Sequence, residues 1–134
     1  MFPLRALALL VAVFAPVSQA DRPTLNPEQS RSLVLAALTQ QQRKLPGIEA
    51  ETFNNPHSSR FTFYTVVWAA GEDQSVVVGN YAVDPYTGDV WSATSACDEL
   101  SNSRLRALQK TVRQGLKLSK SEYKLLRTKG PLCD

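Results

Sequence analysis

The stretch FTFYTVVWAAGEDQSVVVGNYAVDPYTGDVW, residues 61–91, decides the fold of this chain. Three runs within it are rich in β-branched and aromatic residues, which favour strands. These runs are residues 61–68, 76–83 and 89–93. A polar turn separates each pair, at 71–74 and at 84–88, and in the second turn Pro85 presets φ while Gly88 accepts a positive φ. The sequence therefore predicts three adjacent antiparallel strands.

The strands do not alternate cleanly between apolar and polar side chains. Apolar residues fall on both faces of the first strand: Phe61, Phe63 and Val67 on one, Tyr64, Val66 and Trp68 on the other. The second strand opens with three consecutive valines, residues 76–78. A sheet that is apolar on both faces has to be covered on both sides, by helices or by a partner.

A helix is expected before the strands. Asn26 is placed to cap it, Pro27 takes the first helical position, and Gln29 can close a capping box. Apolar residues then recur at helical spacing as far as Leu45, where a Pro-Gly pair ends the run. We expect one helix over residues 27–45.

Two further segments complete the fold prediction. Residues 48–60 begin like a strand and continue into a turn. After Cys97, Asp98 and Ser101 are predicted to cap a helix whose apolar positions repeat at helical spacing, and a short helix follows over residues 119–127. The predicted fold class is α+β, with an N-terminal helix, an antiparallel sheet of three to four strands and a C-terminal helical segment.

The first 20 residues have the pattern of a cleavable secretory signal. Arg5 precedes an apolar run over residues 6–14, and small residues at Ser18 and Ala20 mark a cleavage site. The apolar run is far shorter than the roughly 20 residues that a membrane-spanning helix needs. We therefore expect export to the periplasm and a single mature domain, residues 21–134, with no transmembrane segment.

The chain contains two cysteines, Cys97 and Cys133. An even pair in an exported protein indicates a disulfide, which here would tie the end of the sheet to the end of the helical tail. Closing a loop of this length contributes on the order of 3–4 kcal/mol in the chain-entropy model. A thiol nucleophile is the competing interpretation, but a single histidine, His57, is present to serve it.

Charge is distributed unevenly. Residues 21–97 carry five Lys and Arg against eight Asp and Glu, whereas residues 98–134 carry nine against four. A basic tail can meet nucleic acid, anionic lipid or an acidic protein, or it can be a solvated helix face. Export argues against nucleic acid as a partner.

The sequence holds no recognisable set of catalytic residues. His57 lies in a Pro- and Ser-rich loop without a Gly-x-Ser-x-Gly turn, and the paired acids Glu49 and Glu51 lie in a polar stretch. The segment 84–89 lacks the ligand pattern of a calcium loop, and a phosphate-binding glycine loop is missing. We expect no catalytic residues, no metal and no cofactor, and a protein that works by binding rather than as an enzyme.

The segment NYAVDPYTGDVW, residues 80–91, resembles the strand-turn-strand of PepSY-type and cystatin-like periplasmic domains. The resemblance covers residues 61–91 together with the preceding helix, while the basic helical tail departs from the PepSY pattern. Small exported domains of this outline are similar to immunity proteins that protect bacteria from toxins of type VI secretion systems. The resemblance implies a protein that binds and neutralises a secreted toxin or hydrolase.

Four residues are candidate partner contacts, because interfaces draw much of their energy from aromatic and arginine side chains. They are His57, Arg60, Tyr86 and Trp91. Core packing is an alternative role for Trp91. An envelope accessory domain that binds a small ligand or an anionic surface through the basic tail is the alternative function, and an undetected hydrolase that uses His57 is a third. The oligomeric state stays open.

Overall fold

The computed structural model describes residues 22–55, 60–94 and 98–131. In chain order the elements are α1 (Pro27–Ala37), α2 (Gln40–Arg43), β1 (Glu49–Phe53), β2 (Thr62–Gly71), β3 (Gln74–Val83), β4 (Val90–Ser92), α3 (Ser103–Gly115) and α4 (Lys120–Leu126). The strands form one antiparallel sheet in the order β1-β2-β3-β4, which confirms the α+β prediction. The signal residues 1–20, His57, Cys97 and Cys133 lie outside the described residues, so the signal and the disulfide stay predictions.

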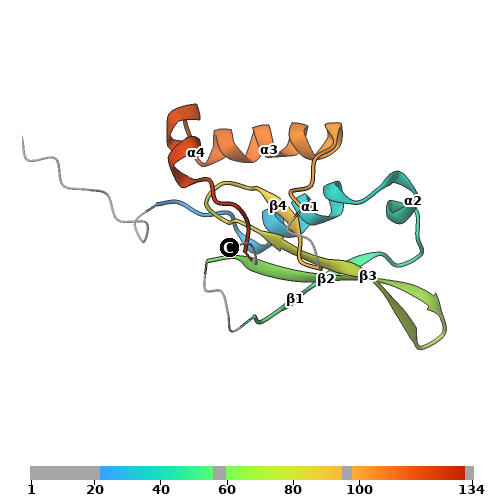
Figure 1. Cartoon of the computed structure of the whole chain (residues 1–134). Coiled ribbons are helices and arrows are strands. Elements are labelled where there is room, and N and C mark those ends of the chain that lie inside the picture. The colour runs from blue at the N-terminus through green and yellow to red at the C-terminus, as the bar shows by residue number, and fades with distance from the viewer. Residues whose placement is uncertain (1–21, 56–59, 95–97, 132–134) are drawn as a thin grey trace, which may run out of the picture.

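The helices stack on one face of the sheet (Figure 1). Helix α1 lies across the strands and α3 packs over α1, so the sheet, α1 and α3 form three successive layers. The main core fills the space between them, and its most completely buried residues are Leu33, Val34, Tyr64, Val66, Val83, Val90 and Leu105. Burial of this apolar surface is what stabilises the domain.

The N-terminal helix is shorter than the sequence indicated, because α1 ends at Ala37. Leu38 leaves the helix with φ −67° and ψ 153°, and its side chain is only 1% exposed. Thr39 then caps the short α2: its hydroxyl accepts from the backbone N–H of Gln42, whose side chain accepts from the Thr39 N–H in return. This second capping box competes with continued helix, and the expected single helix over residues 27–45 is wrong.

Helix α3 begins later than predicted, because Asn102 rather than Asp98 or Ser101 is its cap. The Asn102 side chain accepts from the backbone N–H of Leu105 at 2.7 Å and donates to the carbonyl of Ala36 at 3.0 Å. One side chain thus caps α3 and fixes its start against the end of α1. Of the four apolar positions that the helical spacing indicates, Leu105, Val112 and the C-cap Leu116 are buried and Leu108 is half-buried.

The face of the sheet that points away from the helices carries a second, smaller apolar cluster. Phe53, Phe63, Ala82 and Trp91 stand opposite one another across the four strands. Trp91 is 1% exposed and meets the ring of Phe61 edge-on at 5.5 Å, while the Phe53 and Phe63 rings also lie 5.5 Å apart. The prediction of apolar side chains on both faces of the sheet is therefore confirmed.

Candidate partner-binding surface

The β2–β3 hairpin projects beyond the helical layers (Figure 1). Its strands are ten residues long, and residues 69–77, which include the turn, are all exposed. Gly71 pairs with Gln74, so Glu72 and Asp73 alone make the loop, and Asp73 takes a positive φ of 57°. Aspartate is among the non-glycine residues that occupy this region most readily, which suits a tight hairpin turn.

A β-bulge separates the packed half of the hairpin from the projecting half. Val66 pairs with Gly79 and Val67 pairs with Val77, which leaves Val78 as the extra residue of β3. A bulge bends the strand and increases its twist. The outer half of the hairpin is therefore redirected where it leaves the core.

The turn that precedes β1 braces the hairpin. The backbone N–H of Ala69 donates to the carbonyl of Pro46 at 2.8 Å. Gly47 adopts φ +60°, and a Cβ at this position would lie 3.0 Å from the Cβ of Ala69. Glycine is required here both by the positive φ and by the close approach. The hairpin is thus held at Ala69 and extends freely beyond it.

Apolar side chains remain exposed on the hairpin and on the adjoining outer face of the sheet. Val77 is 58% exposed, Val76 43% and Phe53 38%. Val77 stands beside Val67 and Glu49 in one cross-strand row, and Glu51 lies in the next row on the same face. We call Glu49, Glu51, Phe53, Val67, Glu72, Asp73 and Val77 together the hairpin surface.

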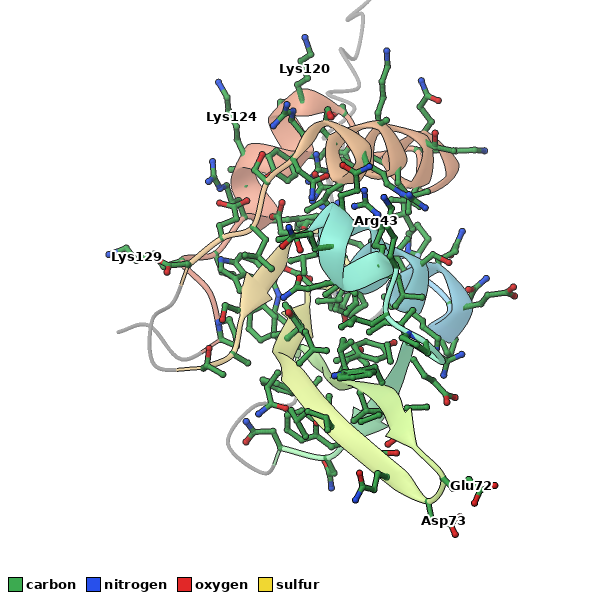
Figure 2. All side chains as sticks on the ribbon, turned by 90° about the vertical axis from the view of Figure 1, so that its right-hand side faces the viewer. Arg43, Glu72, Asp73, Lys120, Lys124 and Lys129 are labelled. Carbon is green, nitrogen blue, oxygen red and sulfur yellow. The ribbon has the colours of Figure 1, made fainter. Side chains whose placement is uncertain are left out.

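The hairpin surface is negatively charged. Its four carboxylates, on Glu49, Glu51, Glu72 and Asp73, are exposed and form no ion pair with any described residue. Residues 61–83 contain no lysine or arginine. Figure 2 shows Glu72 and Asp73 at the tip of the hairpin, with Lys120 and Lys124 on α4 at the opposite end of the molecule. The hairpin tip is therefore acidic, and exposed lysines lie on α4 at the other end of the molecule.

The β3–β4 turn, residues 84–89, forms a buried polar cluster instead of a surface loop. Asp84 and Asp89 are 0% and 1% exposed. Asp89 accepts from the Thr87 hydroxyl at 2.9 Å, from Arg113 at 2.7 Å and from the Tyr123 hydroxyl at 2.7 Å. Three donors from the turn, α3 and α4 thus converge on one carboxylate.

The Asp84 carboxylate, at the start of the same turn, is also held by hydrogen bonds. Its carboxylate accepts from the backbone N–H of Tyr86 at 2.9 Å and from Arg60 at 2.8 Å. Burial raises the pKa of Asp84 above its ordinary value, although both donors favour the charged form. Burial and the hydrogen bond to Asp89 raise the pKa of the Tyr123 phenol to about 12. These groups hydrogen-bond to one another, although the buried Nε of Arg60 has no partner among the described residues, and the cluster fastens the sheet to α3 and α4.

The structure brings Arg60 and Tyr86 together and encloses Trp91. The guanidinium of Arg60 lies 5.4 Å from the centre of the Tyr86 ring, and it also donates to the carbonyl of Leu126 at 2.7 Å. Tyr86 is half-buried, and Trp91 has the core-packing environment that was its alternative role. As partner contacts these residues stay predictions, as does His57.

Sequence reasoning did not single out the hairpin surface, because it treated residues 71–74 as a plain turn. Two signals pointed to it. The run Val76 to Val78 is apolar on both faces, and Glu72 and Asp73 lie within a long stretch without a basic residue. Together they indicate a strand pair with more apolar and acidic surface than its own domain neutralises.

A shallow hollow of about 530 Å³ lies beside the end of α4. Trp91, Glu99, Lys124, Arg127, Thr128 and Lys129 line it. Arg127 already pairs with Glu99 at 2.7 Å, and Lys129 extends outward in Figure 2. Within the described ranges, none of the helices has the length and apolar character needed to cross a bilayer, and no group of three or more acidic, histidine or cysteine residues is placed to hold a metal ion.

Comparison with known proteins gives one relevant similarity. No protein-family profile and no curated protein sequence matches this chain. A solved structure described as a type VI secretion system effector-immunity complex from Pseudomonas protegens contains a chain with the same fold, at 26% identity and a TM-score of 0.57. The match covers 79% of this chain and 90% of the other. These comparisons support the predicted likeness to immunity proteins. They give no support to the predicted likeness to PepSY-type and cystatin-like domains.

Proposed function

We propose that this protein is an immunity protein, which binds a secreted antibacterial toxin enzyme and blocks it. The similarity to a chain of an effector-immunity complex carries the proposal, because it extends over 79% of this chain at 26% identity. The proposal includes export by residues 1–20 and action in the periplasm, where a toxin delivered from a neighbouring cell would arrive.

The shape of the domain suits inhibition by binding. A three-layer body carries a projecting hairpin whose base is braced at Ala69. Preformed elements of this kind bind with little loss of conformational entropy, since they are ordered before the partner arrives. A projecting hairpin of this kind can occupy the cleft of an enzyme. The catalytic residues that it would block belong to the toxin.

The test has a cellular and a biochemical arm. A strain that lacks this gene should lose viability when it is attacked by a competitor that delivers the toxin, and expression of the intact chain should restore growth. The purified chain should capture one enzyme from the attacker's secreted proteins at near-equal amounts and inhibit its turnover. Unchanged survival of the deletion strain, together with no inhibited enzyme, would reject the proposal. Binding only to anionic lipid vesicles, and only at low salt, would favour the accessory-domain alternative.

A further inference from the structure

We propose that the hairpin surface is the docking site for the toxin and that the region of the toxin which it enters is positively charged. This inference rests on the proposed function and specifies the partner chemistry that the function requires. It assigns the contact to β1, β2 and β3, and it places the basic helices α3 and α4 away from the partner.

The apolar part of the argument is the exposure of aliphatic and aromatic side chains on an ordered sheet. Val77 and Phe53 are 58% and 38% exposed and lie on the face opposite the helices. Strand surfaces of this kind gain free energy when a partner removes them from water, at roughly 25 cal/mol per Å² of apolar area. The described elements of the same chain leave both side chains exposed to solvent.

The charge argument decides which partner fits. A partner that covers Val77 and Val67 also covers or adjoins Glu49 and Glu51, and one that receives the hairpin tip receives Glu72 and Asp73. Removing unpaired carboxylates from water is costly, and it is offset only where the partner supplies cations or hydrogen-bond donors. The partner must therefore present lysine or arginine side chains at this contact.

Size and orientation support the same surface. A stable complex buries roughly 800 Å² on each partner, more than the tip of a two-stranded hairpin offers, so the outer sheet face has to join the contact. Lys120 and Lys124 lie at the other end of the molecule, where a basic partner would be repelled (Figure 2). The separation of charge therefore orients the approach, and complementary fields of this kind accelerate association about 10- to 1,000-fold at low salt.

The first experiment uses matched charge variants and, as its probe, the enzyme that the unmodified chain captures and inhibits. The test variant is Glu72→Lys combined with Asp73→Asn, since asparagine tolerates the positive φ at position 73. The control is Lys120→Glu combined with Lys124→Gln, which shifts the charge equally in the opposite sense on exposed positions of α4. We expect the test variant to weaken binding about 10- to 100-fold at low salt, mainly through slower association, and the control to leave affinity within about twofold.

The second experiment locates the contact without removing any charge. A photo-cross-linking amino acid is placed at Val77 in one protein and at Leu125 in another; these exposed positions lie on the outer sheet face and on α4. Irradiation with the captured enzyme should give a cross-link from position 77 and none from position 125. A cross-link from position 125 alone would overturn the inference.

The two proposals fail in different ways. If the unmodified chain captures and inhibits an enzyme but Glu72→Lys with Asp73→Asn binds it equally well, the immunity function stands and the docking surface is wrong. If the unmodified chain inhibits no enzyme, the proposed function fails and the docking inference falls with it. We expect each variant to fold, because the substituted side chains are exposed. Circular dichroism and thermal unfolding check this.

Discussion

Two turns of the same sheet differ in burial: one is exposed to solvent and the other is enclosed. Both contain two acidic residues and join strands of the same antiparallel sheet: Glu72 and Asp73 in the β2–β3 turn, Asp84 and Asp89 around the β3–β4 turn. The first pair is exposed and forms no ion pair with any described residue, whereas the second pair is 0% and 1% exposed. Local sequence does not distinguish them, because the difference comes from what packs on each turn.

The partners of the buried turn come from distant parts of the chain. Arg60 precedes β2, Arg113 lies near the end of α3, and Tyr123 lies on α4. The backbone N–H of Leu25, in the lead to α1, also donates to the carbonyl of Pro85 at 2.9 Å. The β2–β3 turn meets no such elements, because α3 and α4 lie over the other end of the sheet (Figure 1). One turn therefore stabilises the fold, and the other stays exposed as part of the proposed docking site.

Removal of the buried carboxylate should have the largest effect. Asp89→Ala leaves Arg113 and Tyr123 without their shared acceptor, and a buried ion pair that loses one member destabilises a fold by about 3 kcal/mol or more. Asp73→Asn, at the exposed turn, should change the free energy of unfolding by less than about 0.5 kcal/mol. Urea unfolding followed by circular dichroism measures both. Equal effects at the two turns would remove the distinction drawn between them.

The Tyr123 phenol makes the contribution of the buried turn to stability dependent on pH. Its pKa is about 12 in the folded protein against 10.0 in the unfolded chain, so between these values the folded state retains a proton that the unfolded state has lost. The free energy of unfolding should therefore be unaffected by this group below pH 10 and should fall as pH rises toward 12. Tyr123→Phe should lower stability by about 1.5 kcal/mol at neutral pH, through loss of the hydrogen bond to the Asp89 carboxylate, and should flatten the alkaline decline.

Thermal unfolding across the alkaline range measures this effect. Tyr86→Phe is the matched control, because the Tyr86 ring contacts Arg60 while its hydroxyl makes no hydrogen bond to a described residue. An alkaline decline that is equally steep in Tyr123→Phe and in the unmodified protein would mean that another group carries the pH dependence.

Local patterns predicted the strands and the general fold, and long-range packing explains what they missed. The β-branched run of β2 and the positive φ of Gly88 could be predicted, because each depends on a few neighbouring residues. The break after Leu38 was detectable in principle, since Thr39 and Gln42 form a capping box, but the apolar periodicity on both sides masked it. Burial of Asp89 was not predictable, because its partners lie 24 and 34 residues away.

The same reasoning explains why the hairpin surface was not among the contact residues that the sequence suggested. Tyr86 is a candidate contact because interfaces are rich in aromatic side chains; the structure leaves it half-buried, with the Arg60 guanidinium 5.4 Å from the centre of its ring, and its contact role stays a prediction. The sequence places Val77 in a strand that needs cover, and the described residues leave its side chain 58% exposed. The sequence indicated surplus apolar surface, and only the fold shows where that surface lies.

The brace at the base of the hairpin offers a test of intermediate size. Gly47→Ala places a Cβ 3.0 Å from the Cβ of Ala69 in a backbone with φ +60°, and should lower stability by about 1–2 kcal/mol. Gly115→Ala is the control, because its Cβ would meet nothing within 4 Å and alanine favours helix. The backbone amide of Ala69 should exchange faster in Gly47→Ala, because the added Cβ would strain the hydrogen bond from this amide to the Pro46 carbonyl. Unchanged protection of this amide would show that the hairpin is held by its strand pairing alone.

The smallest expected effect on stability belongs to Val77→Thr. Threonine keeps the β-branched shape that suits a strand, and Val77 is 58% exposed, so the free energy of unfolding should change by less than about 0.5 kcal/mol. Docking of the toxin against this position would bury the new hydroxyl without a partner, which costs roughly 1–3 kcal/mol, and affinity should fall at least about fivefold. Leu125→Thr, at an exposed position of α4, should leave affinity unchanged. Titration calorimetry with the captured enzyme separates the two substitutions, and equal affinities would place the contact away from β3.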